Sequence, residues 1–136
     1  MDFSTFDELP DYMSEETLKK YFNQVIHYYD RTEGVNKIDF SEGLYQLSER
    51  QWHTYKALDE EIKQKVDRIM IEVLDPFSYE LMDNVTSIIA YLGLTESFQA
   101  LKEIDQTNLG VDFRALIEET INELDGNIHN PYSGIE

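Results

Sequence analysis

A stretch that follows Asp30 carries several oxygen-bearing side chains at short spacing, and the chemistry they suggest is calcium binding. Asp30, Glu33, Asn36 and Glu42 superficially resemble the acidic loop of an EF-hand. That motif requires a glycine at loop position 6 and a bidentate glutamate at position 12. Counted from Asp30, Gly34 falls at position 5 and Glu42 at position 13. Because no single register fits, we expect no calcium site.

Other catalytic and metal-binding patterns are also missing from the sequence. The three histidines, His27, His53 and His129, lie in different segments, with no HExxH and no Glu-x-x-His pair. There is no cysteine, no glycine-rich phosphate loop and no GxSxG. We therefore expect a protein that is not an enzyme and that uses no metal and no cofactor. A small enzyme whose site is assembled from distant residues stays open as an alternative.

Carboxylates without basic neighbours are the more informative pattern. Asp112, Glu119 and Glu123 recur at i, i+7 and i+11, which places them along one side of a helix, opposite its apolar stripe. Glu80 and Asp83 form a similar group on another segment. Stacked helices would merge the two groups into one acidic surface suited to a basic partner. An ordinary solvated helix face has the same appearance.

The overall charge has the same sign. The chain has 28 acidic and 11 basic residues, a formal net charge of −17, and no Lys or Arg lies between Arg68 and Lys102. Such a field repels nucleic acid and anionic lipid and attracts basic protein surfaces, although it also serves solubility alone. We expect no nucleic-acid partner and no membrane partner.

Length and composition predict a single folded domain. A chain of 136 residues with 41% hydrophobic residues can build a core, and residues 1–13 and 126–136 are expected to be an acidic N-terminal segment and a C-terminal tail. No run is apolar enough to span a membrane, and the acidic N-terminus does not resemble a signal peptide. Together with the missing cysteines, this favours the cytoplasm.

Helical periodicity extends over most of the chain. Ser14 is expected to cap a strongly amphipathic helix, and Asp39 a weaker one that contains Gly43 and Ser48. A second strongly amphipathic helix is expected from about Asp59 to Leu74, with Asp59 in its first turn. Ser78 and Thr95 are expected to cap two further helices, the first ended by Gly93 and the second carrying Phe98, Leu101 and Ile104; a last helix is ended by Gly126. The fold class is therefore all-α. About six short helices in antiparallel pairs form either a HEAT-like α-solenoid or a compact helical bundle.

The C-terminal part of the chain resembles a known family. A helix ending in YLGL at residues 91–94, a following helix with Phe98 and Leu101, and a last helix leading to the tail NPYSGI are similar to HEAT-like immunity proteins of bacterial polymorphic and contact-dependent toxin systems. The resemblance covers about 60 residues, and the first 75 residues have no counterpart in it. Its motifs are structural, not catalytic.

The resemblance implies a protein that binds a cognate toxin domain and blocks its active site or its access to substrate. The expected partner is a basic toxin, for example a nuclease, covered by an acidic helical face. The expected contact residues are Glu80, Asp83, Asp112, Glu119 and Glu123, with Tyr91 and Tyr132 as aromatic contacts. The segment around Tyr132 either reaches the partner or packs on the last helix. A general α-solenoid scaffold or regulatory subunit without a toxin partner is the alternative.

Overall fold

A computed structural model describes residues 3–128, and in this range all regular secondary structure is helical, with no strand. The elements are the 3-10 helix η1 (Phe3–Glu8) and the α-helices α1 (Glu15–Arg31), α2 (Lys37–His53), α3 (Glu60–Val73), α4 (Tyr79–Leu92), α5 (Thr95–Lys102) and α6 (Val111–Leu124). The predicted all-α class is confirmed. None of these helices is both long and apolar enough to cross a membrane.

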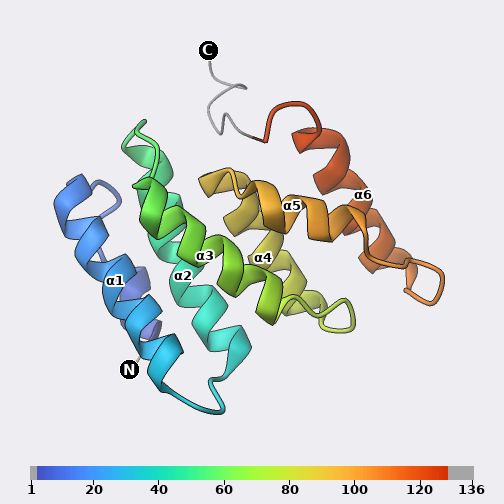
Figure 1. Cartoon of the computed structure of the whole chain (residues 1–136), viewed down its shortest axis with the longest axis horizontal. Coiled ribbons are helices and arrows are strands. Elements are labelled where there is room, and N and C mark those ends of the chain that lie inside the picture. The colour runs from blue at the N-terminus through green and yellow to red at the C-terminus, as the bar shows by residue number, and fades with distance from the viewer. Residues whose placement is uncertain (1–2, 129–136) are drawn as a thin grey trace.

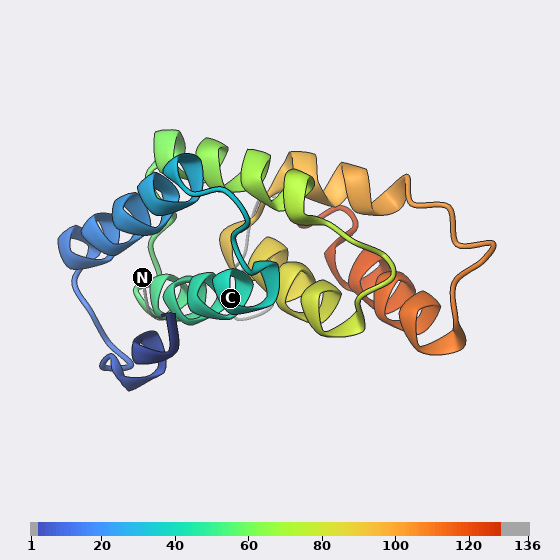
Figure 2. The ribbon, with the colours of Figure 1, turned by 90° about the horizontal axis from the view of Figure 1, so that it is seen from below.

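The α-helices form two layers of three (Figure 1, Figure 2). One layer, here called the odd layer, contains α1, α3 and α5; the even layer contains α2, α4 and α6. Neighbouring helices within each layer pack on each other, and the contact between α2 and α4 is by far the most extensive. Three successive helical hairpins are therefore stacked side by side, and α6 is the last helix of the even layer.

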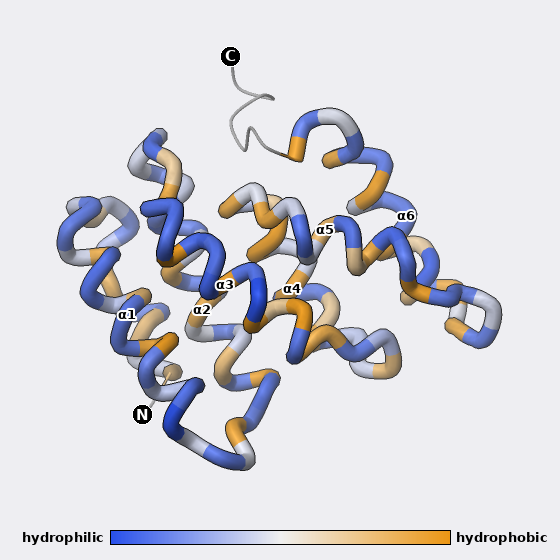
Figure 3. The backbone as a smooth tube through the Cα atoms, viewed as in Figure 1, coloured by the Kyte–Doolittle hydropathy of each residue, from blue (hydrophilic) through white to orange (hydrophobic). Residues whose placement is uncertain are grey.

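The core lies between the two layers and follows the predicted apolar stripes. Each of α1, α3 and α4 directs one apolar stripe inward, and the tube in Figure 3 shows these positions alternating with hydrophilic ones along every helix. The largest fully buried side chains come from five helices and the turn after α4: Leu18, Phe22, Phe40, Leu44, Leu47, Ile69, Met70, Met82, Ile88, Ile89, Leu94 and Leu101. In α6, only Ile117 and Thr120 are buried, as expected for a helix at the end of a stack.

Small residues in α2 allow its neighbours to approach closely. A Cβ atom built on Gly43 would lie 2.9 Å from two atoms of Phe3, so glycine is required where η1 packs on α2. Ser41 is fully buried and accepts a hydrogen bond from the Asn84 amide of α4 at 3.0 Å. Ser48 is also fully buried and donates to the Leu44 carbonyl at 2.7 Å. The residues that weaken α2 as an isolated helix are thus the ones that let η1 and α4 pack on it.

The N-terminal segment is not merely an acidic extension. Phe3 and Phe6 of η1 are buried in the core, and the Phe3 ring meets that of Phe40 edge to face at 5.7 Å between centroids. The guanidinium of Arg50 is buried and donates to the carbonyls of Leu9 at 2.8 Å and Pro10 at 3.1 Å. Among the described residues no carboxylate pairs with Arg50. This cation fastens the N-terminal segment to α2.

The predicted cap Ser14 is confirmed, because its side chain accepts from the backbone N–H of Thr17. Asp59, predicted in the first turn of α3, is instead its N-cap, and its side chain accepts from the backbone N–H of Ile62. The cap of α2 is Asn36 rather than Asp39, whose own backbone N–H donates to the Asn36 side chain at 3.1 Å. Ser78 occupies the N-cap position of α4 but makes no side-chain cap bond there.

Thr95 does not cap α5, because it is already the first residue of that helix. Asp67 of α3 supplies the missing acceptor: its carboxylate receives the backbone N–H of Ser97 at 2.7 Å and that of Glu96 at 3.1 Å, and it also contacts the Ser97 hydroxyl. A buried carboxylate from the neighbouring hairpin therefore caps α5. The helix ends at Lys102, so Ile104 lies beyond it.

Gly93 ends α4 in the left-handed conformation, with φ of 69°, and its N–H donates to the Ile89 carbonyl, as predicted. Gly126 has φ of 84° and follows the last helix, which ends at Leu124.

Candidate functional site

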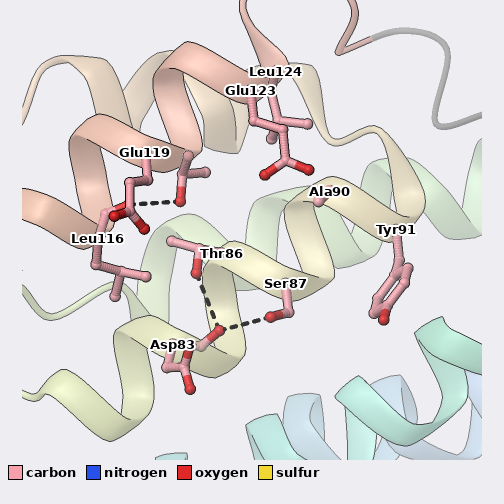
Figure 4. A pocket seen from close by; sticks show the side chains of 10 residues that line it. Asp83, Thr86, Ser87, Ala90, Tyr91, Leu116, Glu119, Glu123 and Leu124 are labelled. Carbon is pink, nitrogen blue, oxygen red and sulfur yellow. Dashed lines mark hydrogen bonds between the residues drawn. The ribbon is translucent and has the colours of Figure 1, made fainter. Parts of the chain in front are cut away.

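A groove of about 310 Å³ separates α4 from α6 on the even layer (Figure 4). We call it the α4–α6 groove. Its walls come from two turns of each helix: Asp83, Thr86, Ser87, Ala90 and Tyr91 of α4, and Leu116, Glu119, Thr120, Glu123 and Leu124 of α6. α4 packs less extensively on α6 than on α2.

The structure brings four of the expected contact residues together in this groove. Asp83 lines one wall, Glu119 and Glu123 line the opposite wall, and Tyr91 lies at one end. In Figure 4 the two glutamates reach from α6 toward α4. The three carboxylates thus come from two helices that are far apart in the sequence.

The remaining expected contact residues are placed differently. Glu80 does not line the groove; it lies beside Glu42 of α2 and contributes to the raised pKa of that carboxyl group. Asp112 is exposed in the first turn of α6, beyond the end of the groove. Tyr132 lies outside the described residues.

One expectation about α6 is wrong. Glu119 and Glu123 do not lie opposite the whole apolar stripe, because Leu116 and Leu124 line the same groove. Residues three positions apart on a helix are neighbours on its surface, so Leu116 lies next to Glu119. The α6 wall is therefore partly apolar.

Three hydroxyl groups in the groove, which sequence reasoning missed, have their protons engaged within their own helices. Thr86 and Ser87 both donate to the carbonyl of Asp83, at 3.1 and 3.0 Å, and Thr120 donates to the carbonyl of Leu116 at 2.7 Å. Their oxygens keep lone pairs that can accept. Carboxylates and these hydroxyls make the polar lining of both walls rich in hydrogen-bond acceptors.

The groove carboxylates have no ion-pair partner among residues 3–128. The four ion pairs found in this range are Lys19–Asp59, Lys65–Glu61, Arg68–Asp30 and Lys102–Asp125. None includes Asp83, Glu119 or Glu123. Their negative charge is left for solvent or for a partner.

An aromatic cluster continues from the groove onto α2. The Tyr91 ring lies 5.8 Å from that of Trp52 and 6.0 Å from that of Tyr45, measured between centroids, and all three side chains are half-buried. Burial and the nearby Glu49 carboxylate raise the pKa of Tyr91, and burial with the neighbouring Tyr91 and Glu49 also raises the pKa of Tyr45. Both phenols therefore stay neutral at physiological pH.

A second depression of about 300 Å³ lies between η1, α2 and α4, and we call it the N-terminal hollow. Its lining includes Asp7, Glu42 and Tyr45. Partial burial, followed by the hydrogen bond and the charge of Glu80, raises the pKa of Glu42. Tyr45 also belongs to the aromatic cluster, so the hollow and the groove lie on either side of that cluster.

No group of three or more His, Asp or Glu side chains in the described part of the chain is arranged to hold a metal ion. Comparisons of the chain with protein-family models, with curated proteins and with solved structures find no match. The features that bear on function are therefore the geometry of the groove and the distribution of charge.

Proposed function

We propose that this chain is an immunity protein that binds a basic bacterial toxin domain through the even layer and neutralises it. The observation that carries the proposal is the α4–α6 groove, which collects Asp83, Glu119 and Glu123 without a basic residue among its lining. A toxin groove that holds RNA or DNA phosphates presents cations of matching geometry. An acidic surface placed over it would occupy the phosphate positions and exclude the substrate.

The distribution of charge also favours the even layer as the surface that binds a basic partner. The helices of the even layer carry nine acidic and three basic residues, and one of those three, Arg50, is buried. The half-buried aromatic cluster beside the groove supplies side chains of the type that dominates tight protein interfaces. Charge would speed the encounter, and the aromatic residues would slow dissociation.

The direct test is co-expression with the product of the neighbouring upstream reading frame in the source genome. We expect relief of toxicity and a one-to-one complex that survives purification at moderate salt. A variant in which Asp83, Glu119 and Glu123 are all changed to Lys should remain helical by circular dichroism and lose most of the rescue. Full rescue by this triple variant would exclude the groove as the neutralising surface.

A general interaction scaffold is the second candidate, because stacked hairpins with an open layer are typical of α-solenoids. A scaffold should bind several basic proteins in the micromolar range. An immunity protein should bind one partner in the nanomolar range or tighter. Titration calorimetry with the co-expressed protein and with unrelated basic proteins separates the two.

A further inference from the structure

The α4–α6 groove has features that discriminate between kinds of cation. Its polar atoms are carboxylate oxygens together with hydroxyl oxygens whose protons are already donated to Asp83 and Leu116. Acceptors are spread along two turns of both walls rather than gathered at one point. An occupant with several hydrogen-bond donors in fixed directions can bond to more of these acceptors than a single compact charge can.

The aromatic end of the groove adds a second requirement. Tyr91 both lines the groove and packs against Trp52, so its ring is held in place by a neighbour. The Tyr91 ring is uncharged at neutral pH, because a tyrosine phenol has a pKa of about 10 and burial raises that pKa here. A neutral ring attracts a flat, weakly hydrated cation to its face.

The volume sets the size of the occupant. About 310 Å³ lies at the lower end of the range for small-molecule sites, and the groove is open to solvent along its length. It suits inserted side chains of a protein. Leu116 and Leu124 provide apolar surface for the aliphatic part of such side chains.

We infer that the α4–α6 groove is an arginine-binding site, in which the partner inserts arginine side chains between the carboxylates of α4 and α6 and against the Tyr91 ring. The guanidinium supplies five N–H donors in a planar fork, which matches carboxylates on two walls and a ring at the end. A lysine ammonium offers three donors and stacks poorly. This inference rests on the proposed function and specifies the chemistry of the partner at the interface.

The test compares two probes on the intact chain: a tetra-arginine peptide and a tetra-lysine peptide, both acetylated and amidated. Trp52, the one tryptophan in the sequence, lies beside Tyr91 and reports occupancy by its fluorescence. Calorimetry replaces fluorescence for the Tyr91 variants, since they alter the surroundings of the indole. We expect the arginine peptide to bind about three- to fivefold more tightly than the lysine peptide, as one stacked cation provides.

Four variants locate the binding. Glu119→Gln should weaken binding of the arginine peptide several-fold, whereas Glu118→Gln, the matched control, should not, because Glu118 is exposed on the same helix outside the groove. Tyr91→Leu should abolish the preference for arginine, and Tyr91→Phe should keep it because the ring remains. If Tyr91→Leu does not fold, the Glu119→Gln and Glu118→Gln pair still decides the location.

The outcomes separate this inference from the proposed function. Equal affinity for the two peptides, or equal effects of Glu118→Gln and Glu119→Gln, would overturn the arginine site. So would failure of both peptides to bind. Each of these results leaves the co-expression rescue to be judged independently, because rescue by an even-layer surface does not require arginine in this groove.

Discussion

The two helical layers of this protein use their charged residues in opposite ways. The odd layer carries eight acidic and seven basic residues, and each of the four ion pairs in the described residues includes a cation from this layer. The even layer carries nine acidic and three basic residues, and its groove carboxylates are unpaired. Of the two layers, the even layer therefore carries the larger excess of negative charge, although both layers share one core.

The difference shows which charges hold the fold together. Asp67, in the odd layer, is buried and accepts two backbone N–H groups of α5. Asp83, Glu119 and Glu123, in the even layer, are exposed and bond to no cation in the described part of the chain. Acids of the first kind stabilise the structure, and acids of the second kind repel each other. A chain that keeps such repulsion on one layer has that layer available for a cationic partner.

The largest expected effect concerns Asp67, the buried acid that caps α5. Asp67→Ala removes the acceptor for the N–H groups of Glu96 and Ser97, and it leaves that of Ser97 buried without a partner. We expect the free energy of unfolding to fall by about 2–4 kcal/mol, measured by urea denaturation. Asp30→Ala, which breaks the exposed pair with Arg68, should cost less than about 1 kcal/mol. Similar losses in the two variants would contradict a special role for Asp67.

The next effect concerns the one buried cation of the even layer. Arg50→Leu leaves the carbonyls of Leu9 and Pro10 without their donor and releases the N-terminal segment from α2. We expect a loss of about 2 kcal/mol in the free energy of unfolding and faster proteolysis within residues 3–12. Lys65→Leu, at an exposed cation of the odd layer, should change neither quantity appreciably. Unchanged proteolysis in the Arg50 variant would show that η1 is held by its phenylalanines alone.

A smaller effect of opposite sign is expected in the groove. Glu119 and Glu123 lie at i and i+4 on α6, and like charges at this spacing are destabilising by about 0.2–0.5 kcal/mol. Glu123→Gln should therefore raise the free energy of unfolding by this amount at low salt, and the gain should shrink in high salt. A loss of stability in this variant would mean that the groove glutamates have a structural role after all.

The smallest effect depends on pH and concerns the N-terminal hollow. The pKa of Glu42 is raised in the folded protein, so the folded state favours its protonated form. This contribution to stability is present below the ordinary glutamate pKa of about 4.3 and is lost as the pH rises through the raised value. Glu42→Gln should thus be more stable than the wild type at pH 7, by no more than about 0.5 kcal/mol, and the two should converge near pH 4. Thermal unfolding at both pH values measures the difference.

Local sequence patterns predicted most helices of both layers but few of the contacts between the helices. The stripe of α3 and the cap Ser14 depend on residues three or four positions apart, which local patterns detect. Gly43 was expected to weaken α2, whereas its lack of a side chain is what admits Phe3. Asp67 looked like one acid among many in α3, because its partners lie 29 and 30 residues away.

The candidate site, too, could be predicted from local sequence patterns only in part. The grouping of Asp83 with Glu119 and Glu123 followed from their helical spacing and from the assumption that the helices stack. Three other features could not be derived in this way. Asp112 lies outside the groove, Glu80 lies beside Glu42, and Tyr91 lies close to Trp52. Each of these depends on the distance and rotation of one helix relative to another, which no spacing within a single helix encodes.

The sequence by itself determined the all-α class, the apolar face of most helices, the left-handed stop at Gly93 and the strong negative charge, because these are properties of single residues or of neighbours within one turn. Only the tertiary structure decided that Asp83, Glu119 and Glu123 line one groove, that Asp67 caps a helix of the next hairpin and that α4 and α6 leave this groove between them. The physical reason is that these features arise from packing between helices, whose closeness is set by side-chain volumes across the interface.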